Sequence, residues 1–186
     1  SAQLGNWWDK ITGGEKVTYS EYVDKYITNI AKPYLGYVCW DNYPFMEDGH
    51  ADKATREKNY LYNMELMAGK CKDNDIELRT FVQVCGDDTG IRKLDNIGDL
   101  RFQIYAGLAF GVKDFIYYGY STSHANAENG NCLFDYEARQ YTWLYDAAKQ
   151  VNNEVHEIEQ IYNEYKWADV MYKKVSASNA MLEGLK

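Results

Sequence analysis

The chain is divided into similar units, each with an apolar strand-like run followed by a helix-like run. Three such runs, centred on Tyr37, Leu78 and Phe115, lie 41 and 37 residues apart. Strands that are separated by whole helices pair in parallel through right-handed crossovers. Units of this kind build either an open doubly wound sheet or a closed eight-stranded barrel. The spacing therefore predicts an α/β fold with a parallel sheet and outer helices.

Four strands fit the sequence. We expect them near 35–43, 76–84, 113–119 and 131–134, in sequential spatial order. A four-stranded parallel sheet leaves two bare edges, which native proteins rarely tolerate. The chain alone should therefore be poorly folded, or it should pair with a second copy or with a missing part of the sheet.

The expected helices have recognisable ends. Thr18 and Glu21 form a capping box for the first helix, which Pro33 should stop. Asn96 caps a later helix that ends at Gly111. The remaining two helices are expected over about 55–73 and 137–164. The segment 166–186 is a tail or the start of a following segment.

Composition limits the possible partners. With 186 residues and 46% hydrophobic content, the chain can bury the core of one ordinary domain. A net charge of −8 argues against a nucleic acid or an anionic membrane surface as the partner, and no run approaches the roughly 20 apolar residues of a membrane span. A neutral ligand fits better. The 18 tyrosines and 5 tryptophans also suit a sugar, whose C–H faces pack on aromatic rings.

Several common chemistries have no support in the sequence. The four cysteines show no C-x-x-C spacing and no histidine at metal-ligand spacing, so we expect free thiols, no metal and no cofactor. The redox compartment stays open. A phosphate-binding glycine loop and a serine nucleophile elbow are both missing.

The clearest candidate site residue is Asp41. It follows the apolar run in "LGYVCWDNYPF", so the strand delivers its carboxylate to the carboxyl-terminal rim, where sites of parallel α/β folds form. Trp40 and Tyr43 flank it, and one of the two rings can stack on a ligand while the other packs inside. Alternatively, Asp41 only bonds loop amides ahead of Pro44.

A series of motifs resembles a known family. In order, these are "YSEYVDKYI", "LGYVCWDNYPF", "RTFVQV", "DLRFQIYAGLAFGVKDFIYYGY" and "CLFDYEARQYTWLYDAAKQVNNEV". Together they resemble the second half of a (β/α)₈-barrel glycoside hydrolase of the β-galactosidase-like, family-42-like group. The resemblance covers about residues 18–160. It implies that 1–165 holds barrel strands five to eight of a TIM-barrel catalytic domain and that strands one to four are absent.

The resemblance implies hydrolysis of O-glycosidic bonds in β-galactoside-like substrates. Such chemistry needs two carboxyl groups. In this group the general acid ends strand four, which the chain lacks, and the nucleophile is a Glu at the end of strand seven, where this sequence reads "FIYYGYS". Asp41 is then the candidate catalytic residue, and the chain alone should be inactive. The alternatives are a non-catalytic carbohydrate-binding or pseudoenzyme domain, and a small open-sheet protein unrelated to sugars.

The resemblance also indicates which residues would contact the sugar. Gln83 ends its strand, and Asp87 follows in a loop, where Asp88 and Gly90 also fit a simple turn. Tyr118 and Tyr120 should share one face of their strand, because side chains alternate along a strand. We therefore expect a carbohydrate substrate at these residues, together with Trp40 and Tyr43.

Overall fold

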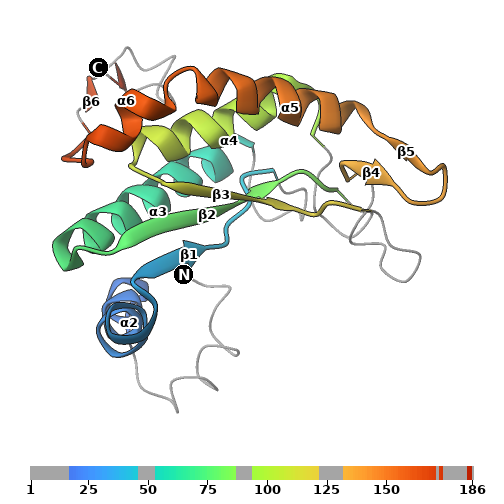
Figure 1. The fold of residues 1–186 in the computed structure, drawn as a ribbon. Helices are drawn as coiled ribbons and strands as arrows, with labels where there is room; N and C mark the ends of the chain where they lie inside the picture. Colours follow the sequence, from blue (N-terminus) through green and yellow to red (C-terminus); the bar gives the residue numbers. More distant parts are fainter. Residues whose placement is uncertain are drawn as a thin grey trace.

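The computed structural model describes residues 17–45, 53–86, 94–121, 132–170, 172–173 and 184–185. The fold is mixed α/β (Figure 1). In chain order its elements are α2 (Tyr19–Tyr26), η2 (Ile27–Leu35), β1 (Tyr37–Trp40), α3 (Lys53–Asn74), β2 (Glu77–Gln83), α4 (Ile97–Ala109), β3 (Asp114–Tyr118), β4 (Phe134–Asp135), β5 (Gln140–Tyr141), α5 (Trp143–His156), α6 (Glu159–Glu164), β6 (Tyr172–Lys173) and β7 (Gly184–Leu185).

A parallel sheet of three strands lies at the centre. Its order is β1-β2-β3, and both pairs are parallel, as the strand and helix spacing predicts. Val38 pairs with Leu78, and Thr80 pairs with Phe115. The sheet is open. The described residues do not form a closed barrel.

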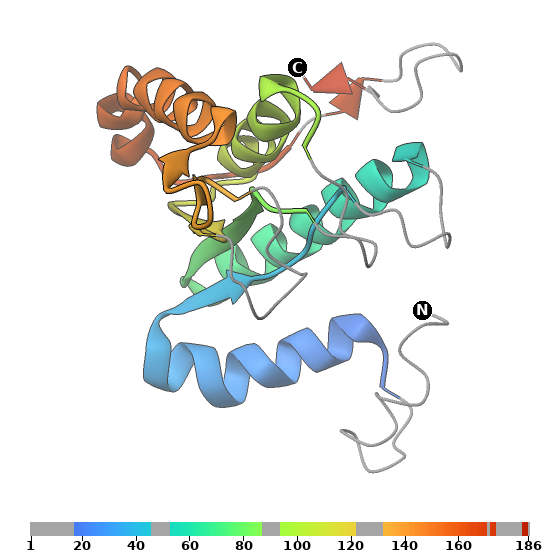
Figure 2. The same ribbon diagram turned by 90° about the vertical axis from the view of Figure 1, so that its right-hand side faces the viewer.

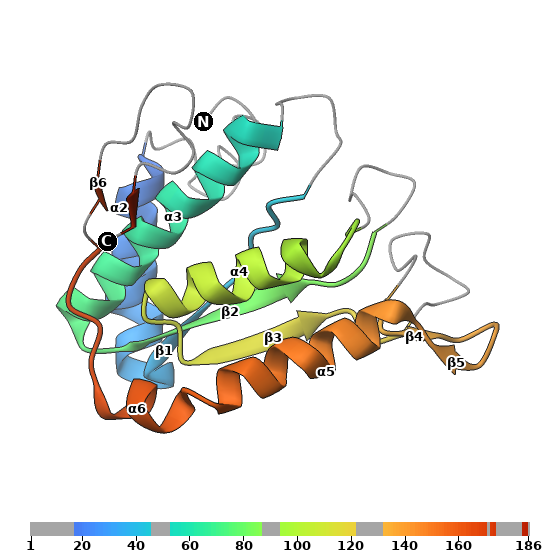
Figure 3. The same ribbon diagram turned by 90° about the horizontal axis from the view of Figure 1, so that it is seen from above.

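Helices cover one face of this sheet. α3, α4 and α5 run along the same side (Figures 1 and 3), while α2 and η2 lie beside β1 and α3 (Figure 2). Because strand side chains alternate, every second residue points into this layer. Val38, Leu78 and Val82 are buried there, against the apolar side chains of the helices.

The opposite face of the sheet carries no helix among the described residues. Tyr37, Cys39 and Phe81 are only partly buried on it, and Ile116 is 40% exposed. Near the amino-terminal ends of the strands, Arg79 forms ion pairs with Glu77 at 2.9 Å and with Asp114 at 3.0 Å. This uncovered face is the main feature that distinguishes the chain from a two-sided α/β sheet.

Several predicted helix boundaries are confirmed. The Thr18 hydroxyl accepts a hydrogen bond from the Glu21 backbone N–H at 3.2 Å, and the Glu21 carboxylate accepts one from the Thr18 N–H at 2.7 Å. Asn96 caps α4 by accepting from the Gly98 N–H at 2.7 Å. Gly111 follows α4 with a φ of 79°, in the left-handed region that glycine adopts easily.

The prediction that Pro33 stops the first helix is wrong. The helix continues through Pro33 to Leu35 as the π-helical segment η2, and it ends at Gly36, whose φ is 76°. The Gly36 N–H donates to the Ala31 carbonyl, five residues back, at 2.8 Å. A wider π turn accommodates a proline that an ordinary α turn would exclude, because the hydrogen-bonding pattern shifts by one residue.

The expected fourth parallel strand is reduced to one bridge. Ser121 pairs with Phe134 in parallel, but Phe134 and Asp135 then form an antiparallel hairpin with β5. The Asp135 carboxylate accepts from the N–H groups of Glu137 and Ala138, both at 3.0 Å. This turn takes up the residues expected to begin a helix at 137, so α5 begins only after its cap, Thr142. The helix also breaks between α5 and α6.

Candidate functional site

The carboxyl-terminal ends of β1, β2 and β3 meet at one edge of the sheet, next to its uncovered face. β1 ends at Trp40, β2 at Gln83 and β3 at Tyr118. Parallel α/β folds bind ligands just outside this edge, because the loops that leave the strands diverge there. The site residues expected from the sequence lie at the ends of these strands or shortly after them.

Asp41 lies next to an aromatic group at this edge. Its side chain is exposed directly after β1 and lies near the Tyr43 hydroxyl, close enough for its charge to act on the pKa of that group. Partial burial, together with the charge of Asp41, raises the pKa of Tyr43 well above its ordinary value, so its proton stays in place. The Tyr43 ring stacks on Tyr118 at 5.7 Å and 22°, and the edge of Phe81 meets Tyr118 at 6.4 Å. We call Asp41, Tyr43, Phe81 and Tyr118 the rim group.

Gln83 holds the segment that carries the rim group. It is fully buried, its side-chain carbonyl accepts from the Phe45 N–H at 3.2 Å, and its amide nitrogen donates to the Phe45 carbonyl at 2.9 Å. The Gln103 side chain on α4 makes the same pair of bonds to the backbone of Gln83, at 2.8 and 3.0 Å. The two glutamines thus connect α4, β2 and the residues after β1. In this arrangement the polar atoms of the Gln83 amide bond to backbone groups, and its contact with a sugar stays a prediction.

Trp40 and Tyr43 divide the roles expected of them. Trp40 is only 4% exposed, and its ring packs on Tyr60 at 5.1 Å. Trp40 therefore belongs to the core under the helices. Tyr43 is the aromatic residue that lies at the rim beside Asp41.

The tyrosines of β3 also separate. Tyr117 lies on the helix side, where its hydroxyl donates to the Asn152 side chain at 2.6 Å, and burial raises its pKa to about 12. Tyr118 belongs to the rim group on the other face. Tyr120 contacts neither of these rings in any described interaction; it is 56% exposed and stacks on Phe134 at 6.4 Å. Tyr118 and Tyr120 therefore belong to two different aromatic groups.

The acidic candidates beyond Asp41 have other places. Asp87 and Asp88 lie outside the described residues. Asp135, in the β4–β5 hairpin, is engaged by the two backbone N–H groups of its own turn. Within the described ranges, Asp41 is thus the carboxylate that lies beside the rim residue Tyr43.

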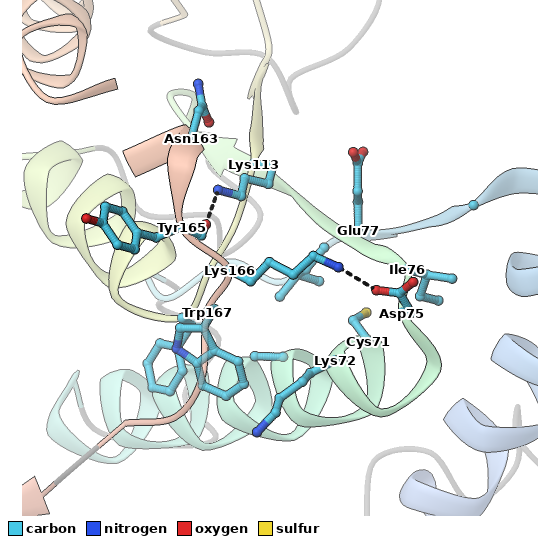
Figure 4. Close-up of a pocket in the computed structure, with 15 residues that line it drawn as sticks. Cys71, Lys72, Asp75, Ile76, Glu77, Lys113, Asn163, Tyr165, Lys166 and Trp167 are labelled. Atoms are coloured by element: carbon cyan, nitrogen blue, oxygen red, sulfur yellow. Dashed lines mark hydrogen bonds and ion pairs between the residues drawn. The ribbon is translucent and has the colours of Figure 1, made fainter. Parts of the chain in front are cut away.

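A pocket lies at the opposite end of the sheet. It has a volume of about 660 Å³ and is lined by residues at the amino-terminal ends of β2 and β3 and by the segment after α6 (Figure 4). Lys166 pairs there with Asp75 at 3.0 Å, and Lys113 donates to the Tyr165 carbonyl at 3.2 Å. In barrel-like sheets, residues at the amino-terminal ends of the strands usually serve stability, whereas ligands bind at the carboxyl-terminal ends. We therefore assign the candidate site to the rim group and not to this pocket.

Sequence reasoning did not identify Phe81 or Gln103. The alternation along β2 carries a signal for Phe81, because residues two apart share a face and Phe81 is two residues before Gln83. No sequence signal points to Gln103, since an amide in the middle of a helix is usually solvated. Its burial follows only from the packing of α4 on β2.

All four cysteines are free thiols, as expected; Cys71, Cys85 and Cys132 are buried and Cys39 is partly exposed. The described residues hold no cluster of three metal-ligating side chains, and no helix among them has the length and apolar character needed to cross a membrane.

The rim group can do two things chemically. An exposed carboxylate beside a tyrosine can accept hydrogen bonds from ligand hydroxyls, and it can act as a general base or as a nucleophile at an electron-poor carbon. The stacked Tyr43 and Tyr118 rings offer an apolar surface beside it.

Comparison with family models, with curated protein sequences and with solved structures finds no match for this chain.

Proposed function

We propose that the chain is the carboxyl-terminal half of a (β/α)₈-barrel glycoside hydrolase that acts on neutral, β-galactoside-like substrates. β1, β2 and β3 would be barrel strands five to seven, and the bridge of Phe134 to Ser121 would mark the position of strand eight, expected near 131–134. The observation that carries the proposal is the rim group, Asp41 with Tyr43, Phe81 and Tyr118, at the carboxyl edge of an uncovered sheet face. The motifs quoted from the sequence add their resemblance to it.

The uncovered face supports the architectural part of the proposal. In a closed barrel the inner face of each strand packs against the inner faces of the other strands. Here Phe81 and Ile116 lie on the face that would be inner, and both are partly exposed. The two lateral ends of the helix layer also expose apolar side chains, namely Tyr34 at 80% on η2 and Ile161 at 67% on α6. Further βα units docking on this face and these ends would bury them.

The chemistry of the rim supports a sugar as the ligand. Sugars present hydroxyl groups around their edge and C–H groups on their faces, and they carry no charge in their simple forms. Asp41 supplies a strong acceptor for hydroxyls, while Tyr43 and Tyr118 supply ring surface. Asp41 is our candidate for the base or nucleophile at the anomeric carbon.

A second function, carbohydrate binding without catalysis, is favoured by one observation. Hydrolysis needs two carboxyl groups about the scissile bond. The end of β3 reads Tyr117, Tyr118 and Gly119, without a glutamate, and Asp135 is engaged by its own turn. The chain by itself should therefore bind sugar without turning it over.

The experiment compares Asp41→Asn with Asp114→Asn. Both changes remove one charge without changing side-chain size. Asp114 is also exposed and lies at the start of β3, at the other end of the sheet, where it pairs with Arg79. Asp114→Asn therefore controls for the loss of an acidic group away from the rim. Each variant is tested in the isolated chain for binding of galacto-oligosaccharides. In the whole enzyme, wherever the chain belongs to a longer one, each is tested for hydrolysis of aryl β-galactosides.

The results separate the two functions. A catalytic Asp41 predicts a loss of roughly 10³-fold in kcat or more for Asp41→Asn, with folding intact. A binding Asp41 predicts a loss near 10-fold, mostly in KM or Kd. Asp114→Asn should change neither constant. If Asp41→Asn behaves like Asp114→Asn, then "DNYPF" is only a strand end and a turn, and the proposed site is wrong. Robust hydrolysis by the isolated wild-type chain would show that the catalytic groups lie elsewhere.

A further inference from the structure

Beyond the end of β3 lies a second group of aromatic rings that the proposed site does not use. Tyr120 stacks on Phe134 at 6.4 Å and 11°, and Phe134 meets the edge of Tyr141 at 5.5 Å and 72°. Tyr141 in turn stacks on Tyr145 at 3.9 Å and 22°. These four residues, here called the aromatic ladder, come from the β3 exit, from both strands of the β4–β5 hairpin and from the first turn of α5.

Backbone contacts hold the ladder at the carboxyl edge of the sheet. The Phe134 N–H donates to the Tyr120 carbonyl at 2.8 Å, and Phe134 pairs with Tyr141 across the hairpin. Thr142, next to Tyr141, donates from its hydroxyl to the Cys132 carbonyl at 2.7 Å. The hairpin extends past the end of β3 in Figure 1, on the side of the carboxyl ends of the strands. The rings are therefore positioned before any ligand arrives.

Two of the four rings are displayed rather than buried. Tyr120 is 56% exposed and Tyr141 is 53% exposed, although each is stacked on one side. Their hydroxyl oxygens lie 3.5 Å apart, so the two phenol groups meet at one place on the surface. Phe134 and Tyr145 pack the hairpin against its surroundings. Packing alone does not explain why about half of the Tyr120 and Tyr141 side chains is exposed to solvent. Rigid, half-exposed tyrosines provide contact area at low entropic cost.

The chemistry of the ladder selects the ligand. None of its rings carries a charge, and the whole chain carries −8, which disfavours phosphate, sulfate or polyuronate ligands. The two hydroxyls bond to each other at 3.5 Å and keep further lone pairs, which a purely apolar ligand would not use. A neutral pyranose ring matches both features, since its C–H face packs on a phenol ring and its hydroxyls bond to the phenol oxygens.

We propose that the aromatic ladder is a stacking subsite for one pyranose ring of a neutral oligosaccharide whose neighbouring unit occupies the rim group. This inference rests on the proposed function, because it extends the same sugar site outward along the exit of β3. Tyr118 belongs to the rim group and Tyr120 to the ladder, so the two subsites are joined by a single intervening residue, Gly119. The substrate class is then an oligosaccharide rather than a simple disaccharide.

The test is the dependence of affinity on chain length. The isolated chain is titrated by calorimetry with neutral β-linked galacto-oligosaccharides, from the disaccharide to the hexasaccharide. Wild-type affinity should rise with length as the ladder becomes occupied. Tyr120→Ala and Tyr141→Ala should each weaken binding of the longer sugars by about three- to ten-fold, the size of one aromatic contact, and should leave the disaccharide unchanged. Tyr120→Phe keeps the ring and should retain most of the affinity.

Tyr62→Ala is the matched control. Tyr62 lies on α3 and is 66% exposed, so its loss removes a comparable surface ring away from the carboxyl edge. Circular dichroism checks that each variant is folded, and Tyr141→Ala, in a surface hairpin, serves if Tyr120→Ala does not fold.

The possible failures are distinguishable. If the ladder variants bind every sugar like the wild type while Asp41→Asn weakens binding, the ladder is not a subsite and the proposed site stands. Equal losses for short and long sugars would also overturn the ladder as a separate subsite. If the wild-type chain binds no sugar of any length, both the ladder and the proposed function are wrong.

Discussion

Two glycines in neighbouring helices should respond oppositely to the same substitution. Gly107 of α4 is buried, and a Cβ atom added to it would lie 2.5 Å and 2.9 Å from two ring carbons of Phe115 on β3. Gly69 of α3 has no atom within 4 Å of the corresponding position. Gly107 thus permits α4 to approach the sheet closely, whereas nothing in the structure requires glycine at Gly69.

The expected magnitudes follow from two opposing effects. Replacing glycine by alanine inside a helix stabilises it by about 1 kcal/mol, which is the whole effect expected for Gly69→Ala. For Gly107→Ala, overpacking against Phe115 costs about 1–3 kcal/mol. The Phe115 ring has little room to move, because it packs both on the buried residues between α3 and the sheet and on those between α4, α5 and the sheet. The two variants should therefore differ in their free energies of unfolding by about 1–3 kcal/mol, with Gly107→Ala the less stable.

The assay is urea denaturation followed by circular dichroism, at one protein concentration, because self-association changes apparent stability. A double variant, Gly107→Ala with Phe115→Leu, tests the cause. If the clash with Phe115 is the reason, the alanine should cost less in the Phe115→Leu background than in the wild type. Stabilisation of the chain by Gly107→Ala to the same degree as by Gly69→Ala would refute the close approach of α4 to β3.

Three further predictions concern other parts of the molecule. The buried Tyr60 hydroxyl has no hydrogen-bond partner among the described residues, so Tyr60→Phe should raise the free energy of unfolding by about 1 kcal/mol in the same urea assay. Hydrogen bonding to Arg101 lowers the pKa of Glu154 from 4.5 to about 2, so its contribution to stability is complete above pH 4.5 and is lost as the pH falls towards 2. Glu154→Gln should reduce the loss of unfolding free energy between about pH 4.5 and pH 2. If the variant loses as much stability over this range as the wild type, Glu154 does not have this role. Because one sheet face is uncovered, light scattering should find the chain dimeric or poorly folded, whereas a cooperative monomer would count against a half-barrel.

The sheet and most helices could be predicted because their signals are local and repeated. The runs around Tyr37 and Leu78 bury alternate residues under a helix, and the run around Phe115 partly buries alternate residues, so their periodicity survives in the sequence. Capping at Thr18 and Asn96 depends on bonds within three residues, which sequence also reveals. These features need no knowledge of distant parts of the chain.

The errors arose where distant residues decide the local structure. Pro33 is a strong helix breaker in isolation, but η2 is packed against β1 and α3 and adopts a wider turn instead. The segment 137–142 is expected to be helical from its sequence, but the Asp135 carboxylate and the pairing of Tyr141 with Phe134 fix it as a turn. The aromatic ladder depends on the same pairing, so it could not be found from the sequence either.

The candidate site was predictable only in part. The end of the apolar run places Asp41 at an edge of the sheet, and its aromatic neighbours suggest a ligand. The sequence does not say whether Trp40 or Tyr43 packs in the core. Burial of Trp40 and the stacking of Tyr43 on Tyr118 settle that point. An amide such as Gln83 gives the same sequence signal whether it serves a sugar or the backbone, and only the contacts with Phe45 distinguish the two.

The paired glutamines make the geometry of the rim insensitive to proton concentration. Each amide donates with its nitrogen and accepts with its oxygen, and neither gains or loses a proton in the range where proteins are folded. A glutamate of the same shape would lack the donor, so neither position can be replaced by the acid without losing a bond to the backbone. Tyr43 also keeps its proton. The bonds that hold the residues after β1 in place therefore persist through a change of pH, and the ring of Tyr43 keeps its position beside Tyr118.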